Sequence, residues 1–417
     1  MDTRTARRLA LLVGVTLACE RLTSWLAIDH HAFDIRVYDG AVTSWSRGRD
    51  LYSYSLGHRH LGFTYPPFAA LLMLPMALLP PYAVIALNAV AIAVGIALLS
   101  RVVVGSTFLA GRHGLWFTTA VVVPLAALSQ PVRDTLSFGQ VNVYLALLVL
   151  ADLVALRRGA RWAGVGAGLA TAIKLTPGLF VVFYLLTGQH RAARNAVAAA
   201  GGATLLAALV APTASLRFWT QALMDPSRVG RYDDAANQSL AGVLTRVTDS
   251  SHLPTALWLA CAVAVLLVGL ARAQQAVQRQ DLMTAFTLVG LTAGLVSPFT
   301  WVHHLVWLVP AVLLLWDVGA QRRSTPLLLL AVATVVLFAS GVNDLAGQHT
   351  GHHTDHGIWV LLGENAYALW CLGLLLALPT DRVVVTCPRA VRGRMTVEHS
   401  REGTAREREQ PAPRRGP

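Results

Sequence analysis

Apolar runs of about 20 residues recur from one end of this 417-residue chain to the other, and they constrain its fold more than any other feature. A helix of that length crosses the hydrocarbon core of a bilayer. Because backbone groups in lipid must be hydrogen-bonded within their own segment, such runs predict membrane-spanning helices. Charged residues make up 13% of the chain, against about 25% in soluble domains. We therefore expect an all-α polytopic membrane protein rather than a soluble enzyme with a large core.

Arginine clusters between the apolar runs indicate how the spans are oriented. Cytoplasmic loops are enriched in Lys and Arg, and this rule places both termini in the cytoplasm and gives about twelve transmembrane or re-entrant helices. They are expected over residues 8–28, 66–79, 82–103, 114–129, 141–156, 162–187, 193–211, 254–272, 282–297, 302–317, 325–342 and 357–379. The short run 66–79 fits an interfacial or re-entrant helix. The run 162–187 is either one straight span or, because arginines flank both its ends, two halves that bend at residues 174–177.

Composition divides the chain into a long apolar part and a polar end. We expect one transmembrane domain over residues 1–380 and a disordered, basic cytoplasmic tail over 381–417, which is rich in Arg, Glu, Pro and Gly. The net charge of +12 comes largely from this tail and the short loops, so it does not indicate nucleic-acid binding. The four cysteines lack the spacing of a metal site, and we expect no disulfide.

Polar segments between the runs are the places where chemistry is expected. Under the arginine rule they all face outward and together predict one large external site carried by loops. They cover residues 33–67, 129–142, 174–177, 225–246, 297–304 and 343–356. In the first outer loop, 29–64, Asp34 lies at the water–lipid boundary, where a partly desolvated carboxylate suits a general base. The alternative, which spacing alone favours, is that Asp34 caps a helix beginning near Ile35.

Lys174 is the only lysine of the chain, and it lies inside an otherwise apolar stretch. An ionisable side chain at membrane depth costs about 2.5–3.5 kcal/mol on insertion scales, so such residues usually pair with an anion or line a wet cavity. Pro177 would break the helix there and free backbone N–H groups, which also favour an anion. We expect a phosphate ligand in an outward-facing pocket. The alternative is an interfacial lysine whose amine reaches the lipid headgroups.

Histidines, amides and aromatic residues supply further candidates. His303 and His304 stand at the mouth of an expected span, where imidazoles suit proton transfer or substrate orientation. The histidine-rich stretch 349–356 is more like a metal cluster, but its spacing matches no common site. The amides either bond a sugar or cap helices, and the aromatic residues either stack on a sugar or lie at the membrane interface. These candidates are Gln140, Asn142, Asn237, Gln238, Trp45, Tyr52, Tyr54 and Trp301.

No nucleotide-binding, nucleophile-elbow or zinc-protease motif stands out in the sequence. An enzyme of this kind is therefore expected to take its activated substrate from the membrane. Five segments between residues 33 and 317 resemble, in order, the signatures of glycosyltransferase family 87. They are FDIRVYDGAVTSWSRGRDLYSY with FTYPPFAALLMLPMALLP, GQVNVYLALLVLADLVALRR, AGVGAGLATAIKLTPGLFVVFYLL, NQSLAGVLTR and SPFTWVHHLVWLVP. The resemblance implies a membrane enzyme of the GT-C class, a helical bundle whose outward-facing loops carry the site.

Members of this family are typically actinobacterial α-1,2-mannosyltransferases that take mannose from polyprenyl-phosphate-mannose. They extend phosphatidylinositol mannosides and lipomannan-type glycolipids at the outer face of the plasma membrane. The resemblance implies that Asp34 is the general base and that Lys174 binds the donor phosphate. It also implies that His303 or His304 lies between donor and acceptor. Supporting contacts are expected from Arg36 at the phosphate and, at the substrates, from Tyr38, Tyr65, Gln140, Asn142, Asn237, Gln238 and Trp301.

The implied reaction inverts a β-linked mannosyl phosphate to an α product, so one base suffices. Its leaving phosphate needs positive charge and N–H donors, and we expect no metal and no cofactor. The expected partners are the lipid-linked donor, the glycolipid acceptor and the bilayer. Two alternatives stay open. One is another polyprenyl-phosphate sugar transferase, such as an arabinofuranosyl one; the other is a transporter or flippase for a polyprenyl-linked sugar, which would use the phosphate pocket without a base.

Overall fold

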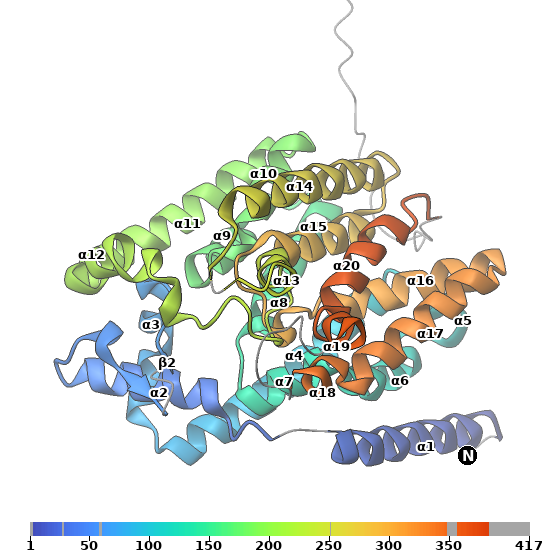
Figure 1. Cartoon of the computed structure of the whole chain (residues 1–417). Coiled ribbons are helices and arrows are strands. Elements are labelled where there is room, and N and C mark those ends of the chain that lie inside the picture. The colour runs from blue at the N-terminus through green and yellow to red at the C-terminus, as the bar shows by residue number, and fades with distance from the viewer. Residues whose placement is uncertain (1–2, 27–28, 58–60, 251, 348–356, 383–417) are drawn as a thin grey trace, which may run out of the picture. The chain divides into compact units, whose positions relative to one another are not determined.

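The computed structural model describes residues 3–26, 29–57, 61–250, 252–347 and 357–382. These residues belong to one compact unit, and they are helical apart from connecting turns and one antiparallel hairpin (Figure 1). The hairpin pairs two short strands, β1 (Ser55–Leu56) and β2 (Leu61–Gly62). The expected all-α class is confirmed. The histidine-rich stretch 349–356 and the expected tail beyond Arg382 lie outside the described residues.

Four helices are long and apolar enough to cross a membrane on their own. They are α1 (Thr3–Leu26), α4 (Pro81–Val104), α11 (His190–Val210) and α14 (Thr255–Gln278). Two bent pairs pass the same test together, namely α6 (Leu115–Ala127) with α7 (Gln130–Phe138), bent by 76°, and α19 (Ile358–Glu364) with α20 (Ala366–Ala377), bent by 65°. By length and composition the described residues hold four to six spans, which fits a polytopic membrane protein. The expected count of about twelve is not confirmed.

Other apolar runs form shorter helices, and some of these are buried by protein. The helix α15 (Leu282–Val296) has 15 residues, which rise about 22 Å against a hydrocarbon core of about 30 Å. Every residue from Met283 to Leu295 is buried, as suits a helix that is apolar on all sides. The remaining helices are α2 (Phe33–Ser46), α3 (Pro67–Met73), α5 (Phe108–His113), α8 (Asn142–Arg157), α9 (Val165–Ile173), α10 (Leu179–Leu186), α12 (Pro212–Thr220), α13 (Leu240–Val247), α16 (Leu308–Arg322), α17 (Thr325–Ser340) and α18 (Val342–Ala346).

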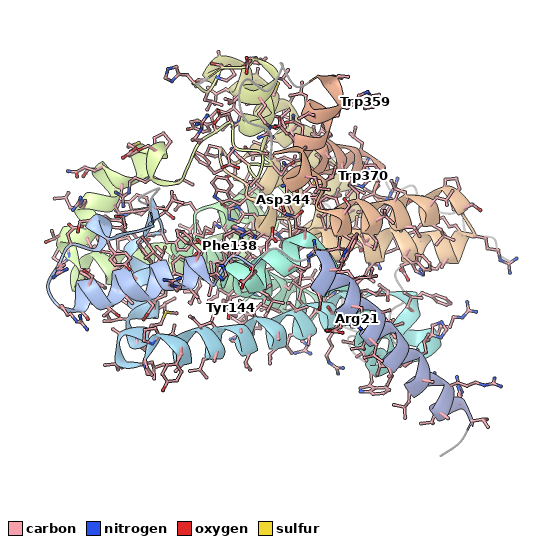
Figure 2. All side chains as sticks on the ribbon, turned by 60° about the horizontal axis from the view of Figure 1, so that its bottom comes forward. Arg21, Phe138, Tyr144, Asp344, Trp359 and Trp370 are labelled. Carbon is pink, nitrogen blue, oxygen red and sulfur yellow. The ribbon has the colours of Figure 1, made fainter. Side chains whose placement is uncertain are left out.

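Two segments expected as outer loops contain helices. The sequence predicts a turn at 129–142, but α7 occupies most of it, with Pro131 in its first turn and its last residue, Phe138, labelled in Figure 2. Gly139 ends α7 with a φ of 76°, and a Cβ there would lie 2.7 Å from the Ile35 side chain. Glycine therefore allows α7 to approach α2.

The first outer loop likewise contains α2, which buries five side chains at helical spacing. They are Ile35, Val37, Tyr38, Ala41 and Val42. Because α2 packs this apolar face against the protein, it holds its first turn, with Asp34, in a fixed place. The candidate site is thus carried by helices as well as by the turns between them.

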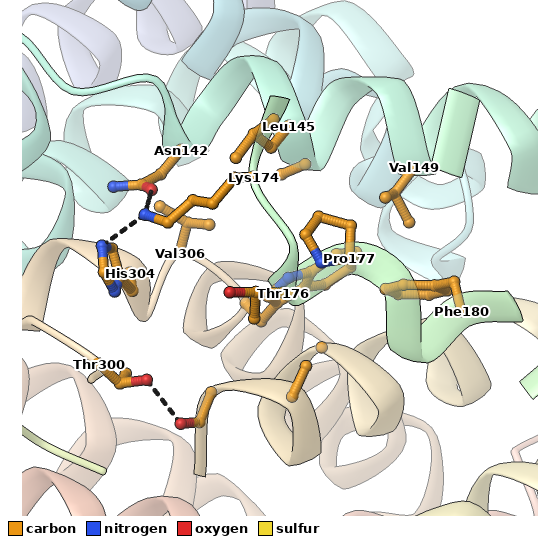
Figure 3. Close-up of a pocket in the computed structure, with 15 residues that line it drawn as sticks. Asn142, Leu145, Val149, Lys174, Thr176, Pro177, Phe180, Thr300, His304 and Val306 are labelled. Carbon is orange, nitrogen blue, oxygen red and sulfur yellow. Dashed lines mark hydrogen bonds between the residues drawn. The ribbon is translucent and has the colours of Figure 1, made fainter. Parts of the chain in front are cut away.

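The expected break at residues 174–177 is present. The helix α9 ends before Lys174, whose backbone is extended, and the short 3-10 helix η3 (Thr176–Gly178) leads into α10. Pro177 has no N–H to donate within a continuous helix, and the alternative of one straight span is wrong. The break brings Lys174 against α8 and a second 3-10 turn, η6 (Val302–His304) (Figure 3).

Candidate active site

Asp34 stands at the end of a chain of hydrogen bonds. Gln140 Nε2 donates to Asp34 Oδ2 at 2.6 Å, and Gln140 Oε1 accepts from the Tyr65 hydroxyl at 3.1 Å. The Tyr65 hydroxyl also lies 2.9 Å from that of Tyr38. Because Tyr65 occupies the amide oxygen, the amide NH₂ is directed at the carboxylate. The helix cap is at Ala32, whose side chain forms no capping bond, so the alternative reading of Asp34 as a helix cap is wrong.

The surroundings of Asp34 make it a stronger base. Burial raises the pKa of its carboxyl to about 6, although the hydrogen bond from Gln140 and the nearby charges of Lys174 and His30 act in the opposite direction. A general base works best when its pKa is close to the operating pH. Asp34 is therefore ionised near neutral pH and still able to take up a proton.

Lys174 and His304 form a close pair at the helix break. Lys174 Nζ lies 2.7 Å from His304 Nε2 and donates to Asn142 Oδ1 at 3.3 Å (Figure 3). The backbone N–H of Trp301 donates to His304 Nδ1 at 3.2 Å. A neutral imidazole in that position carries its own hydrogen on Nε2. Such a ring can donate to Lys174 only when the lysine is an uncharged amine.

The pKa of Lys174 fits this pairing. Lys174 lies outside the helices that pass the test for membrane spans. Burial lowers the pKa of its amine to about 7, and the negative charge of Asp34 offsets only part of this. A group that is close to half charged at neutral pH gains its full charge readily when an anion arrives. Lys174 therefore has the properties of an anion ligand that becomes charged on binding.

His303 has a fixed backbone and a free ring nitrogen. Its carbonyl oxygen accepts from Asn142 Nδ2 at 2.9 Å and from the Thr135 hydroxyl at 3.3 Å. The residue is only 6% exposed, and its Nε2 atom has no hydrogen-bond partner. Burial and the charge of Lys174 lower its pKa well below the usual value. A buried, neutral imidazole with an unsatisfied nitrogen is available to a ligand.

Most of the expected site residues share one cavity of about 670 Å³. Its lining includes Asp34, Tyr38, Tyr65, Gln140, Lys174, Trp301, His303 and His304. Asn142 lines a smaller crevice that shares Lys174 and His304 with this cavity. The fold thus brings together residues from α2, α7–α8, the break before η3, and η6, which are up to 270 positions apart in sequence (304 − 34).

Three expected site residues line neither this cavity nor the adjoining crevice. Arg36 is exposed on α2, because it lies between Ile35 and Val37, which belong to the buried face of that helix. Asn237 and Gln238 are fully buried, and their amides bond to backbone groups. Asn237 accepts from the Thr300 N–H at 3.0 Å, while Gln238 donates to the Glu364 carbonyl at 2.6 Å. The Asn237 side chain thus holds the turn before η6, and the Gln238 side chain holds the end of α19.

Five further ionisable residues, which the sequence did not single out, also line the cavity: His30, Asp134, Arg228, Asp234 and Asp344. Arg228 Nη2 donates to the backbone oxygens of Tyr52 at 2.8 Å and Phe63 at 3.3 Å, and its Nε is buried without a partner. Arg228 is thus a second cation in the cavity wall, whereas Arg36 is exposed outside it. Four of the five lie in polar segments already marked as outward-facing, which was the signal that could have found those four.

Comparisons with known proteins identify the family and the relatives of this chain. The profile of glycosyltransferase family 87 matches residues 63–298. A relative from Mycobacterium tuberculosis (strain ATCC 25618 / H37Rv) is 33% identical over 407 residues, covering 94% of this chain and 92% of its own length. A relative from Mycolicibacterium smegmatis (strain ATCC 700084 / mc(2)155) is 29% identical over 388 residues, covering 87% and 88%. Both are named polyprenol-phosphate-mannose-dependent alpha-(1-2)-phosphatidylinositol mannoside mannosyltransferase.

A third relative, from Mycobacterium tuberculosis (strain CDC 1551 / Oshkosh), carries the name of the corresponding phosphatidylinositol pentamannoside mannosyltransferase. It is 30% identical over 335 residues, covering 78% of this chain and 75% of its own length. No solved structure matches the chain. The family match covers more than half of the chain and the first relative nearly all of it. The chain belongs to glycosyltransferase family 87.

Proposed function

We propose that this membrane protein transfers mannose from polyprenol-phosphate-mannose to a phosphatidylinositol mannoside and forms an α-1,2 bond. Full-length relatives with this activity in their names support the donor, the acceptor and the linkage. The family match favours this function over a transferase of another lipid-linked sugar and over a transporter. The observation that carries the proposal is a carboxylate of raised pKa and a lysine of lowered pKa in the wall of one cavity.

In the proposed reaction Asp34 takes the proton of the acceptor hydroxyl. The hydroxyl oxygen then attacks the anomeric carbon of the mannose while the bond from that carbon to the phosphate oxygen breaks. The proton ends on Asp34 Oδ1 or Oδ2, and the electron pair of the broken bond ends on the lipid phosphate. A single displacement inverts the configuration, so a β-linked donor gives the α product without a covalent enzyme intermediate.

The cations of the cavity stabilise the leaving phosphate. Lys174 gains its full charge as the phosphate arrives, and Arg228, in the wall of the same cavity, adds the charge of a guanidinium group. Positive groups that already stand where negative charge develops lower the barrier in a water-poor site. We propose that this arrangement suffices without a divalent metal, because the leaving group is a lipid monophosphate rather than a pyrophosphate.

The orientation of the site is part of the proposal. The arginine-rich loops and the tail, with nine arginines after Thr380, favour cytoplasmic termini and a cavity that opens to the outer face. The accessibility of a single cysteine introduced at Ser227, beside Arg228, to a membrane-impermeant maleimide in intact cells tests this. Labelling only after the cells are broken would contradict an outer site.

The reaction itself is tested with purified protein in lipid vesicles, polyprenol-phosphate-mannose and phosphatidylinositol mannosides. Loss of a general base lowers kcat by about 10²–10⁴-fold, and we expect Asp34→Asn to do so. The variant should retain donor binding, because asparagine still accepts from Gln140. Asp39→Asn, on the same helix but outside the cavity lining, is the matched control. EDTA should change neither enzyme. Full activity of Asp34→Asn would refute the base, and a product with no new α-1,2 bond would refute the function.

A further inference from the structure

The cavity wall contains two further carboxylates. Asp134 on α7 and Asp344 on α18 both line it, and Figure 2 labels Asp344 together with Phe138, which lies on the same helix as Asp134. The mechanism above uses neither residue. Asp134 is only 7% exposed, and burying two carboxylates side by side is unfavourable unless each finds hydrogen-bond donors.

One amide holds the two carboxylates together. Gln130 Nε2 donates to Asp344 Oδ2 at 2.6 Å and to Asp134 Oδ2 at 3.2 Å. Its Oε1 accepts from the Tyr367 hydroxyl at 2.7 Å, which fixes the NH₂ group on the carboxylate side. Asn343 Nδ2 also donates to Asp344 Oδ1 at 3.1 Å, and the charge of Arg133 acts on both carboxylates. Each carboxylate has about four lone-pair directions, so these bonds still leave part of their hydrogen-bonding capacity unused. The pair is built to receive additional donors.

A row of rings leads from this pair to the η6 turn. His30 Nε2 lies 3.8 Å from Asp134 Oδ1, and the His30 ring stacks on Phe138 at 3.7 Å. The Phe138 ring lies 5.2 Å from the ring of His303, whose Nε2 is buried without a partner in the same cavity wall. Carboxylates, an unsatisfied imidazole and flat rings together suit a ligand that has both hydroxyl groups and C–H faces.

Charge separates the two ends of the cavity. Asp34 and His303 both interact electrostatically with Lys174 and with His30, so they lie between the cationic end and the acidic end. Arg133 brings one positive charge to this end, but two adjacent carboxylates outweigh it. They repel a phosphate group and accept strong hydrogen bonds from neutral hydroxyls. The donor phosphate therefore belongs at Lys174, and the acidic end favours an uncharged polyol.

We propose that Asp134, Asp344, His30 and Phe138 form the acceptor subsite, in which the terminal hexose of the acceptor is held by its hydroxyls with one of them directed at Asp34. The proposal rests on the proposed transfer to a glycolipid and specifies where its acceptor sugar binds. The two carboxylates bond hydroxyl groups that do not react, and the Phe138 and His30 rings bound the pocket. They are binding residues, whereas Gln130 is a positioning residue.

The test measures binding, so that it does not depend on turnover. The affinities of the purified protein for a phosphatidylinositol mannoside and for polyprenol-phosphate-mannose are measured by microscale thermophoresis in detergent. A hydrogen bond to a charged group is worth about tenfold or more in affinity. Asp134→Asn and Asp344→Asn should each weaken acceptor binding by about that factor and leave donor binding unchanged. Asp29→Asn, an exposed carboxylate outside the cavity lining, should change neither.

A second measurement changes the acceptor as well as the protein. Acceptors lacking single hydroxyls on the terminal mannose are bound to the wild type and to Asp344→Asn. At least one should lose affinity only in the wild type, because its missing hydroxyl is the one that Asp344 bonds. Equal losses in both proteins, or unchanged acceptor affinity in both Asn variants, would overturn the subsite. A loss of acceptor affinity on adding EDTA would also overturn it, since the carboxylates would then hold a cation. Intact binding without transfer would contradict the proposed function alone.

Discussion

Replacing Gln140 by leucine removes the hydrogen bond to Asp34 and leaves the carboxylate in place. The bond from Gln140 Nε2, at 2.6 Å, lowers the pKa of Asp34 against the effect of burial and leaves it at about 6. Leucine fills the buried position but donates no hydrogen bond. A hydrogen bond to a charged group is worth about 1.5–3 kcal/mol, and one pKa unit corresponds to about 1.4 kcal/mol. Gln140→Leu should therefore raise the pKa of Asp34 by about one to two units.

The consequence is visible in the pH dependence of kcat. The ionised carboxylate is the base, so activity is present above its pKa and lost as the pH falls through it. For the wild type we expect this acid limb above about pH 6, the pKa of Asp34 in the absence of donor, and for Gln140→Leu about one to two units higher than in the wild type, with much of the rate retained at high pH. Mannose transfer is followed between about pH 5 and pH 9, where the limb should be complete.

The matched control is Asn88→Leu. Asn88 Nδ2, on α4, donates to the Gly139 carbonyl at 3.0 Å, one residue before Gln140. This variant therefore removes a hydrogen bond to the same turn without touching Asp34. Its acid limb should stay at the position found for the wild type. An unchanged limb in Gln140→Leu, or the same shift in both variants, would refute the assignment of Asp34 as the titrating base.

Other variants test the lysine and the buried amides. Lys174→Gln removes the expected phosphate ligand, and steady-state kinetics should show a donor KM raised about tenfold or more, with the acceptor KM little changed. Because the pKa of Lys174 is about 7, its charge is lost as the pH rises above that value, and kcat/KM for the donor should fall there. Lys174→Arg stays charged, so the same fall in that variant would assign it to another group. Asn237→Ala leaves the buried Thr300 N–H without its partner and should cost about 1–3 kcal/mol of stability. A lower Tm in detergent with both KM values unchanged is expected, whereas altered KM with unchanged Tm would restore Asn237 as a substrate ligand.

Apolar length predicted some elements of the fold better than others. The runs that form α4, α11 and α14 are long, apolar and close to arginines. Pro177 correctly predicted the helix break beside Lys174. The helix α7 was missed because Gln130, Arg133 and Asp134 are typical turn and surface residues. Their burial depends on partners far along the chain, such as Tyr367 for Gln130, and a single segment carries no information about them.

The candidate site shows the same division. Asp34, Lys174 and the pair His303–His304 stood out because ionisable groups next to apolar runs are rare, and all line the cavity. Asn237 and Gln238 were also expected there but do not line it. The sequence cannot distinguish an amide that bonds to backbone groups from one that bonds to a sugar. Asp134 was passed over for the opposite reason, since carboxylates are common in loops, and only the fold shows that it is buried in the cavity wall.

Asp34 and Lys174 influence each other's charge across the cavity. Lys174 lowers the pKa of Asp34, and Asp34 raises that of Lys174. A donor phosphate bound at Lys174 cancels the field of the ammonium group at Asp34, so the pKa of Asp34 is higher in the donor complex than in the free enzyme. By linkage, an ionised Asp34 weakens phosphate binding by the same factor.

This coupling stabilises the transition state more than the bound substrates. With the donor in place, Asp34 is at its most basic and its negative charge repels the phosphate. As the acceptor proton moves to Asp34, that repulsion disappears while the phosphate gains negative charge beside Lys174. The unfavourable interaction is thus confined to the ground state, and the favourable one grows towards the transition state, which is the difference that accelerates a chemical step. The acid limb of kcat should accordingly lie at higher pH than the acid limb of kcat/KM for the donor.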